Sequence, residues 1–219
     1  TKTPNLPQAE QIGRLAATRG ASALPSFPGA RPLMSLPTTP KRVRPRPTND
    51  GTMPAAIAAG IADRIKNDDP IGAKVLLDGI DATLSDAARA EWRQRVAWSF
   101  YIENDDASAY SLAQLAGQSA GPWAAEGWWT AGLAAWRLGD CQGAAEAFQK
   151  TSTRAENPEL AAAALYWQSR ALVRCRQPER AAAPLRAAAA RDETLYGMLA
   201  AEQLGVKLPE QHGAADFTQ

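Results

Sequence analysis

Histidine and cysteine are scarce in this chain of 219 residues, which contains one histidine and two cysteines. A structural zinc site usually needs four clustered ligands, so we expect no metal site. Two cysteines also exclude a scaffold that depends on several disulfides. The single histidine, His212, falls in a short polar tail (residues 210–219), and we expect it to be neither a ligand nor a base.

Long apolar runs and an excess of one charge are also lacking. No stretch approaches the ~18 consecutive apolar residues of a transmembrane helix, so we expect no transmembrane segment. The formal net charge of +1 argues against a broadly basic nucleic-acid-binding protein, and we expect no nucleic-acid partner.

Recognisable catalytic motifs are missing as well. The chain has no glycine-rich phosphate loop, Cys-x-x-Cys, His-Glu-x-x-His or Gly-x-Ser-x-Gly sequence, so we expect no cofactor and no catalytic residue. A general acid needs an apolar pocket that raises its pKa. We interpret the glutamates of the expected helices as residues of solvated faces; these are Glu91, Glu126, Glu146 and Glu202.

Proline and positive charge gather at the start of the chain. Residues 1–52 hold nine of the 16 prolines and a net charge of +6, and the remainder carries −5. Such proline density opposes regular helix, so we predict an extended arm or linker with one short helix near residues 8–18. The run Lys41–Arg46 either contacts an anionic partner or is simply solvated. A third alternative is a strap lying along the acidic remainder, in which case deleting residues 1–48 would lower the melting temperature.

Residues 53–209 show only helical signals. Asp69-Pro70, Asn157-Pro158 and Gln177-Pro178 place proline at a first helical turn, and Ser85 is a good N-cap. No run of β-branched residues alternates with period two, so we expect no strands. Pro184 falls inside an expected helix and should kink it or delay its start.

A repeat of about three dozen residues runs through this region. Four pairs place a small residue four positions before a large one: Ala73/Leu77, Ser108/Leu112, Ala144/Phe148 and Ala181/Leu185. Their large members are separated by 35, 36 and 37 residues, a register that resembles the tetratricopeptide repeat. Such units stack, because none can bury its apolar face alone. We therefore predict an all-α fold, a right-handed α-solenoid of helical hairpins.

The aromatic residues and cysteines have structural and functional interpretations. All seven tryptophans lie between residues 92 and 167, where most should pack between alanine-lined helices. Trp123 and Trp129 are candidates for stacking on sugar rings. Cys141 and Cys175 occupy equivalent hairpin turns, where a helix spacing of ~8–10 Å places them near but not within disulfide reach. They either form a bond in an oxidising compartment or stay reduced.

Three segments resemble a known family. Residues 194–205, with Tyr196-Gly197-Met198-Leu199-Ala200, are similar to the segment that closes the helical superhelix of soluble lytic transglycosylases. Residues 164–171, with Tyr166-Trp167 and Arg170-Ala171, resemble the preceding helix of that family, and residues 129–139 resemble an element one repeat earlier. The likeness covers roughly residues 55–209. The family's catalytic Glu-Ser-x-Phe motif and its Gly-Leu-Met-Gln stretch do not occur in this chain.

The resemblance implies a periplasmic protein that binds peptidoglycan glycan strands through a non-catalytic scaffold. This scaffold is either part of a longer enzyme, whose catalytic domain would lie beyond residue 219, or a stand-alone relative that lacks the chemistry. The glycan- or partner-binding candidates are Trp123, Trp129, Tyr166, Arg170 and Tyr196. Two alternatives remain open. One is a tetratricopeptide-type scaffold that binds a peptide or cell-envelope protein in its concave groove, and the other is an enzyme with an unrecognised site.

Overall fold

The computed structural model describes residues 4, 6, 8–27 and 40–207. The chain forms two compact units, Thr1–Thr38 and Thr39–Gln219. Residues 40–52, which the sequence assigns to the arm, therefore belong to the same unit as the helices that follow them. The predicted tail 210–219, with His212, lies outside the described residues.

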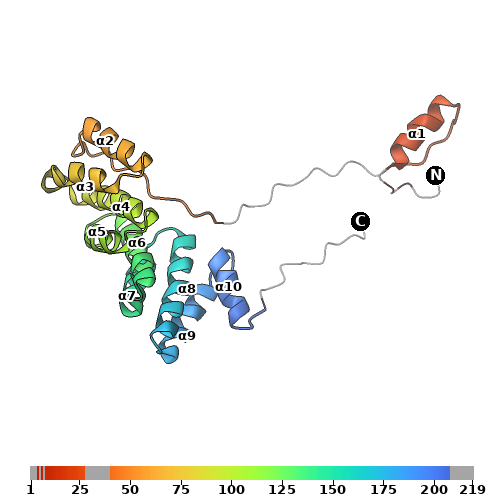
Figure 1. Cartoon of the computed structure of the whole chain (residues 1–219). Helices are drawn as coiled ribbons and strands as arrows, with labels where there is room; N and C mark the ends of the chain where they lie inside the picture. The colour runs from red at the N-terminus through yellow and green to blue at the C-terminus, as the bar shows by residue number, and fades with distance from the viewer. Residues whose placement is uncertain (1–3, 5, 7, 28–39, 208–219) are drawn as a thin grey trace. The chain divides into compact units, whose positions relative to one another are not determined.

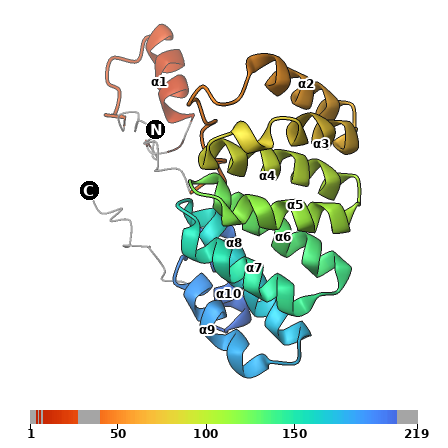
Figure 2. The same ribbon diagram turned by 90° about the vertical axis from the view of Figure 1, so that its left-hand side faces the viewer.

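All the regular secondary structure of the described residues is helical, with no β-strand among them, as the sequence predicts. The smaller unit contains α1 (Ala9–Thr18), in which Gly13 packs against the ring of Phe27. The helices of the larger unit stack largely in chain order, as Figures 1 and 2 show. They are α2 (Ala55–Lys66), α3 (Pro70–Asp78), the short 3-10 helix η1 (Asp81–Thr83), α4 (Asp86–Ile102), α5 (Asp106–Gln118), α6 (Trp123–Leu138), α7 (Cys141–Arg154), α8 (Pro158–Arg174), α9 (Pro178–Ala189) and α10 (Leu195–Gln203).

The same turn joins the two helices of each hairpin. One residue in it has a positive φ: Asp68 (56°), Asn104 (64°), Gly139 (82°) and Arg176 (59°). In the first three hairpins an aspartate follows and caps the second helix, accepting a hydrogen bond from the backbone N–H three residues later; these are Asp69, Asp105 and Asp140. The repeat predicted from the sequence is thus a repeated helix–turn–helix structure.

The core is continuous along the stack. The large residue of every small/large pair is buried: Leu77, Leu112, Phe148 and Leu185. Three apolar clusters follow one another, the first from α2 to α7, the second from α6 to α9 and the third from α8 to α10. Each hairpin buries its apolar face only against its neighbours, which is the property that defines an α-solenoid.

Of the two outcomes predicted for Pro184, a kink or a delayed start of the helix, the delayed start does not occur. The helix α9 begins at Pro178 and continues through Pro184, so its start is not delayed. Pro184 itself is buried in the packing of α9, where the surrounding tertiary contacts offset the one backbone hydrogen bond that proline cannot donate.

Two kinds of feature are absent from the described ranges. None of the helices found there combines the length and the apolarity that a membrane crossing requires. The same residues contain no cluster of three or more His, Cys, Asp or Glu side chains arranged to hold a metal ion.

Candidate functional site

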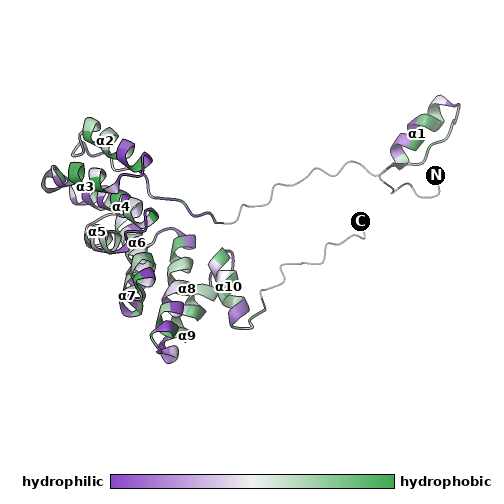
Figure 3. Ribbon diagram, viewed as in Figure 1, coloured by the Kyte–Doolittle hydropathy of each residue, from purple (hydrophilic) through white to green (hydrophobic). Residues whose placement is uncertain are grey.

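An extended segment lies across the first helices of three successive hairpins. We call residues 40–52 the strap. It runs from the start of α8, where Asn157 donates from Nδ2 to the carbonyl of Lys41 (2.8 Å), over α6 to α4. Its residues are predominantly hydrophilic, as Figure 3 shows by colour. We call the surface of α4, α6 and α8 that it covers the strap face.

Two buried glutamates anchor the strap. Glu126 of α6 is 3% exposed and forms a two-pronged ion pair with Arg42, with both N···O distances 2.6 Å. Glu91 of α4 is 1% exposed and accepts from the backbone N–H of Thr48 (2.5 Å) and from the guanidinium of Arg95 (2.8 Å). A paired guanidinium and carboxylate is among the strongest charge-assisted contacts in proteins.

These carboxylates correct the sequence interpretation. Glu91 and Glu126 do not lie on solvated faces, whereas Glu146 and Glu202 are exposed as expected. The physical reason is that each buried carboxylate has a guanidinium partner, which is Arg42 of the strap for Glu126 and Arg95 of α4 for Glu91. The two residues are separated by 35 positions, as are the turn residues Asn104 and Gly139, but this shared place in adjacent repeats does not indicate burial.

Tryptophans complete the contact. The indole N–H of Trp123 donates to the carbonyl of Arg46 (2.9 Å), and this ring is 2% exposed beneath the strap. The guanidinium of Arg42 lies 6.0 Å from the ring centre of Trp129, and that of Arg44 lies 5.8 Å from Trp98. In the described structure Trp123 is covered by the strap and offers no open face to a sugar.

The C-terminal end of the strap is fixed to the start of α4. The carboxylate of Asp50 accepts hydrogen bonds from the hydroxyl of Ser85, the N-cap of α4, and from the backbone and hydroxyl of Thr52. These bonds, the Ser85 hydroxyl first, lower the pKa of Asp50 below its usual value. The carboxylate therefore stays ionised at neutral pH and holds this end of the strap.

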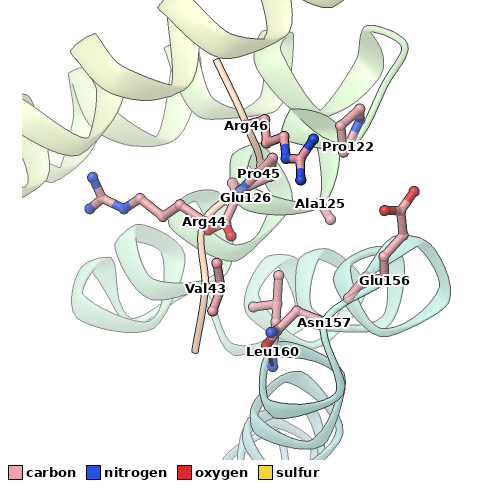
Figure 4. Close-up of a pocket in the computed structure, with 11 residues that line it drawn as sticks. Val43, Arg44, Pro45, Arg46, Pro122, Ala125, Glu126, Glu156, Asn157 and Leu160 are labelled. Atoms are coloured by element: carbon pink, nitrogen blue, oxygen red, sulfur yellow. Dashed lines mark hydrogen bonds between the residues drawn. The ribbon is translucent and has the colours of Figure 1, made fainter. Parts of the chain in front are cut away.

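A pocket of about 440 Å³ remains beside the strap (Figure 4). The strap residues Val43 and Pro45 lie on one side of it, and Ala125 of α6 and Leu160 of α8 on the other. Val43 is 62% exposed, so the strap does not fill this part of the strap face.

The remaining candidate residues come together elsewhere, on α8 and α10. The Tyr166 and Tyr196 ring centres are 5.4 Å apart, and the Arg170 guanidinium lies 5.9 Å from Tyr166. The sequence candidates thus fall into two groups, Trp123 with Trp129 at the strap and Tyr166 with Arg170 and Tyr196 further along α8.

Sequence reasoning missed two partners of Arg170 and a second arginine beside them. Its guanidinium also lies 5.0 Å from the ring centre of Trp167 and 5.9 Å from that of Trp136, while Arg174 lies 4.6 Å over Trp136. We call these residues the aromatic–arginine cluster: Trp136, Tyr166, Trp167, Arg170 and Arg174. An open pocket of about 310 Å³ lies against it and reaches Gln203 of α10. Spacings of three and four residues along α8 could have indicated this shared face.

A disulfide joins the two hairpins nearest this cluster. Cys141 is the first residue of α7 and Cys175 caps α8, and their Cα atoms lie 5.5 Å apart. This is closer than the helix spacing expected from stacking, because both cysteines sit in turns where adjacent hairpins converge.

Removing the strap's anchor should loosen the strap. In Arg42→Ala, Glu126 loses its ion-pair partner, and we expect the free energy of unfolding to fall by about 2–3 kcal/mol, below the usual range for a fully buried pair because Arg42 is 35% exposed. The melting temperature should drop by about 5–10 °C. Thermal unfolding measures this, and deletion of residues 1–48 should lower the melting temperature at least as far.

Arg44→Ala is the matched control for Arg42→Ala. It removes the same charge two residues away, but Arg44 faces the Trp98 ring rather than a buried carboxylate, so we expect a loss below about 1 kcal/mol. Equal melting temperatures for the two variants would contradict the assignment of Arg42 as the anchor.

Comparisons with known proteins provide no relative. No family model, no curated protein and no solved structure matches this chain.

Proposed function

We propose that this chain is the non-catalytic helical scaffold of a lytic transglycosylase-like protein of the periplasm, which holds peptidoglycan glycan strands during cell-wall turnover. The observation that carries the proposal is the aromatic–arginine cluster, of which Trp136, Tyr166, Trp167 and Arg170 lie in the segments that resemble that family.

The chemistry of the cluster suits this ligand. Flat indole and phenol rings pack against the C–H faces of sugars while their polar edges still form hydrogen bonds. The guanidinium groups of Arg170 and Arg174 can pair with the free carboxylates that peptidoglycan carries on its stem peptides. Arg170 is exposed and so is free to reach a ligand. The Cys141–Cys175 disulfide supports an oxidising compartment such as the periplasm.

Retention on purified peptidoglycan sacculi tests the proposal. We expect the wild-type chain to be retained and Arg170→Ala to bind about 3–10-fold more weakly, because it loses a cation held against three rings. Arg180→Ala is the control, since Arg180 is an exposed arginine of α9 that bonds only to the nearby Gln177 in the described structure. Unchanged retention of Arg170→Ala would contradict the proposal, and release of soluble glycan fragments would contradict the non-catalytic assignment.

A second candidate function is a tetratricopeptide-type scaffold that binds a peptide or a cell-envelope protein. The specific observation that favours it is the strap, an extended peptide already lying across three first helices of the solenoid. Repeat proteins commonly use such extended surfaces to bind partners.

A further inference from the structure

We propose that the strap face is a binding site for an extended, arginine-bearing segment of a partner polypeptide, and that the chain's own strap is its resident competitor. The proposal rests on the second candidate function and gives it a ligand chemistry. It is independent of glycan binding, because it uses none of the residues of the aromatic–arginine cluster.

The first step is the charge buried under the strap. The only described hydrogen-bonding partner of the Glu126 carboxylate is Arg42, at 2.6 Å on both oxygens. A carboxylate that is 3% exposed is costly without such a partner. The strap face therefore requires a cation in this position, and the two-pronged geometry selects the planar guanidinium of arginine over the ammonium of lysine.

The second step is that most of the other hydrogen bonds to the strap involve its backbone groups and not its side chains. Trp123 and Asn157 donate to the carbonyls of Arg46 and Lys41, and Glu91 accepts from the N–H of Thr48. Asn157 can do this because its other amide atom, Oδ1, caps α8 by accepting from the backbone of Leu160. Any extended peptide presents these groups, so sequence selectivity is concentrated at the position of Arg42.

The third step is that the strap fits incompletely. Pro45 and Pro47 favour an extended conformation and reduce the entropy lost on binding. Yet the strap leaves the pocket beside Val43 open, and in Figure 4 the side chains of Arg44 and Arg46 extend away from one another on either side of the backbone. An incompletely fitted segment can be displaced by a better one.

The fourth step concerns the source of the ligand. Asp50 lies only a few residues before the start of α2, and its bond to Ser85 fixes the end of the strap to α4. The strap is therefore tethered beside its own site, where it has a high effective concentration. A second copy's strap offers the same contacts without that advantage. A partner segment with additional contacts is therefore the occupant that can replace the strap.

The test measures binding of a labelled peptide, residues 40–48 (Pro-Lys-Arg-Val-Arg-Pro-Arg-Pro-Thr), to the full-length chain by fluorescence anisotropy. We expect Arg42→Ala to bind this peptide at least ~10-fold more tightly than the wild-type chain, because its own strap competes poorly. Arg44→Ala, whose strap keeps its anchor, should bind no better than the wild-type chain. Adding Glu126→Gln to Arg42→Ala should abolish the gain.

Two peptide variants with equal charge locate the recognition. The peptide with Arg42→Gln should lose at least ~10-fold in affinity, and the one with Arg44→Gln should lose little. Equal losses would overturn the arginine-specific proposal while leaving the second candidate function standing. No binding of any peptide to an Arg42→Ala chain that keeps its helical circular dichroism would overturn both.

Two further measurements cover folding and oligomerisation. If Arg42→Ala unfolds, hydrogen exchange at the Thr48 amide of the wild-type chain is followed with excess unlabelled peptide; faster exchange supports displacement, and unchanged exchange overturns it. Concentration-dependent dimers of Arg42→Ala that disappear when Glu126→Gln is added would overturn the partner assignment, because the occupant would then be a second copy.

Discussion

Replacing Cys141 and Cys175 together by serine is expected to lower the free energy of unfolding by about 3–4 kcal/mol, because the bond closes a chain loop between residues 34 positions apart. For a chain of this size the melting temperature should fall by about 8–15 °C. The effect should be concentrated in α6 to α9, since each hairpin of a solenoid depends mainly on its neighbours.

Reducing agent provides the control for this prediction. The wild-type chain should lose a similar amount of stability in dithiothreitol, whereas the double serine variant should not respond to it. Thermal and denaturant unfolding, followed by circular dichroism, measure both. An unchanged melting temperature of the wild-type chain in dithiothreitol would contradict the prediction that the disulfide stabilises the fold.

Gly127→Ala should be strongly destabilising, because Gly127 of α6 packs directly against the backbone of α5. A Cβ at residue 127 would lie 2.6 Å from the backbone nitrogen of Gly117 and 2.9 Å from the Cβ of Ala116, so α5 and α6 would have to separate. We expect a loss of about 3 kcal/mol, at the upper end for overpacking, because a helix backbone cannot yield as a side chain can. Gly127 also adjoins Glu126, so a displaced α6 should weaken the anchor of the strap. The backbone amides of the strap should then exchange hydrogen faster.

Gly60→Ala is the matched control for Gly127→Ala. Its new Cβ would meet only the end of the flexible Leu76 side chain, at 3.2 Å. Because alanine is a better helix former than glycine by ~1 kcal/mol, we expect this variant to be neutral or slightly more stable. Equal melting temperatures for the two variants would mean that the close approach of α5 and α6 does not limit stability.

The repeat could be predicted because it depends on residues that act over short distances in the sequence. Small residues such as Ala144 allow close helix packing, and capping residues such as Asp140 begin the second helix, whatever the rest of the chain does. The helix starts at Pro70, Pro158 and Pro178 follow from such signals. Pro184 departs from its local preference because tertiary packing outweighs one missing hydrogen bond.

The candidate site was only partly predictable. Tyr166, Arg170 and Tyr196 were found through the family resemblance, and the structure brings them together. Trp136 and Arg174 were missed because each looks like an ordinary helix residue until neighbouring hairpins place them side by side. The strap was one of three alternatives for the arm, and composition could not choose among them.

The sequence by itself determined that this chain is a stack of helical hairpins, because helix periodicity, caps and small residues act over a few positions or one repeat. Only the tertiary structure decided which charges are buried. Glu126 finds its partner 84 residues away, in Arg42, and the cost of burying a carboxylate depends on whether that distant guanidinium arrives. The residues that neighbour Glu126 in the sequence do not indicate this pairing, so the strap face could be identified only from the folded structure.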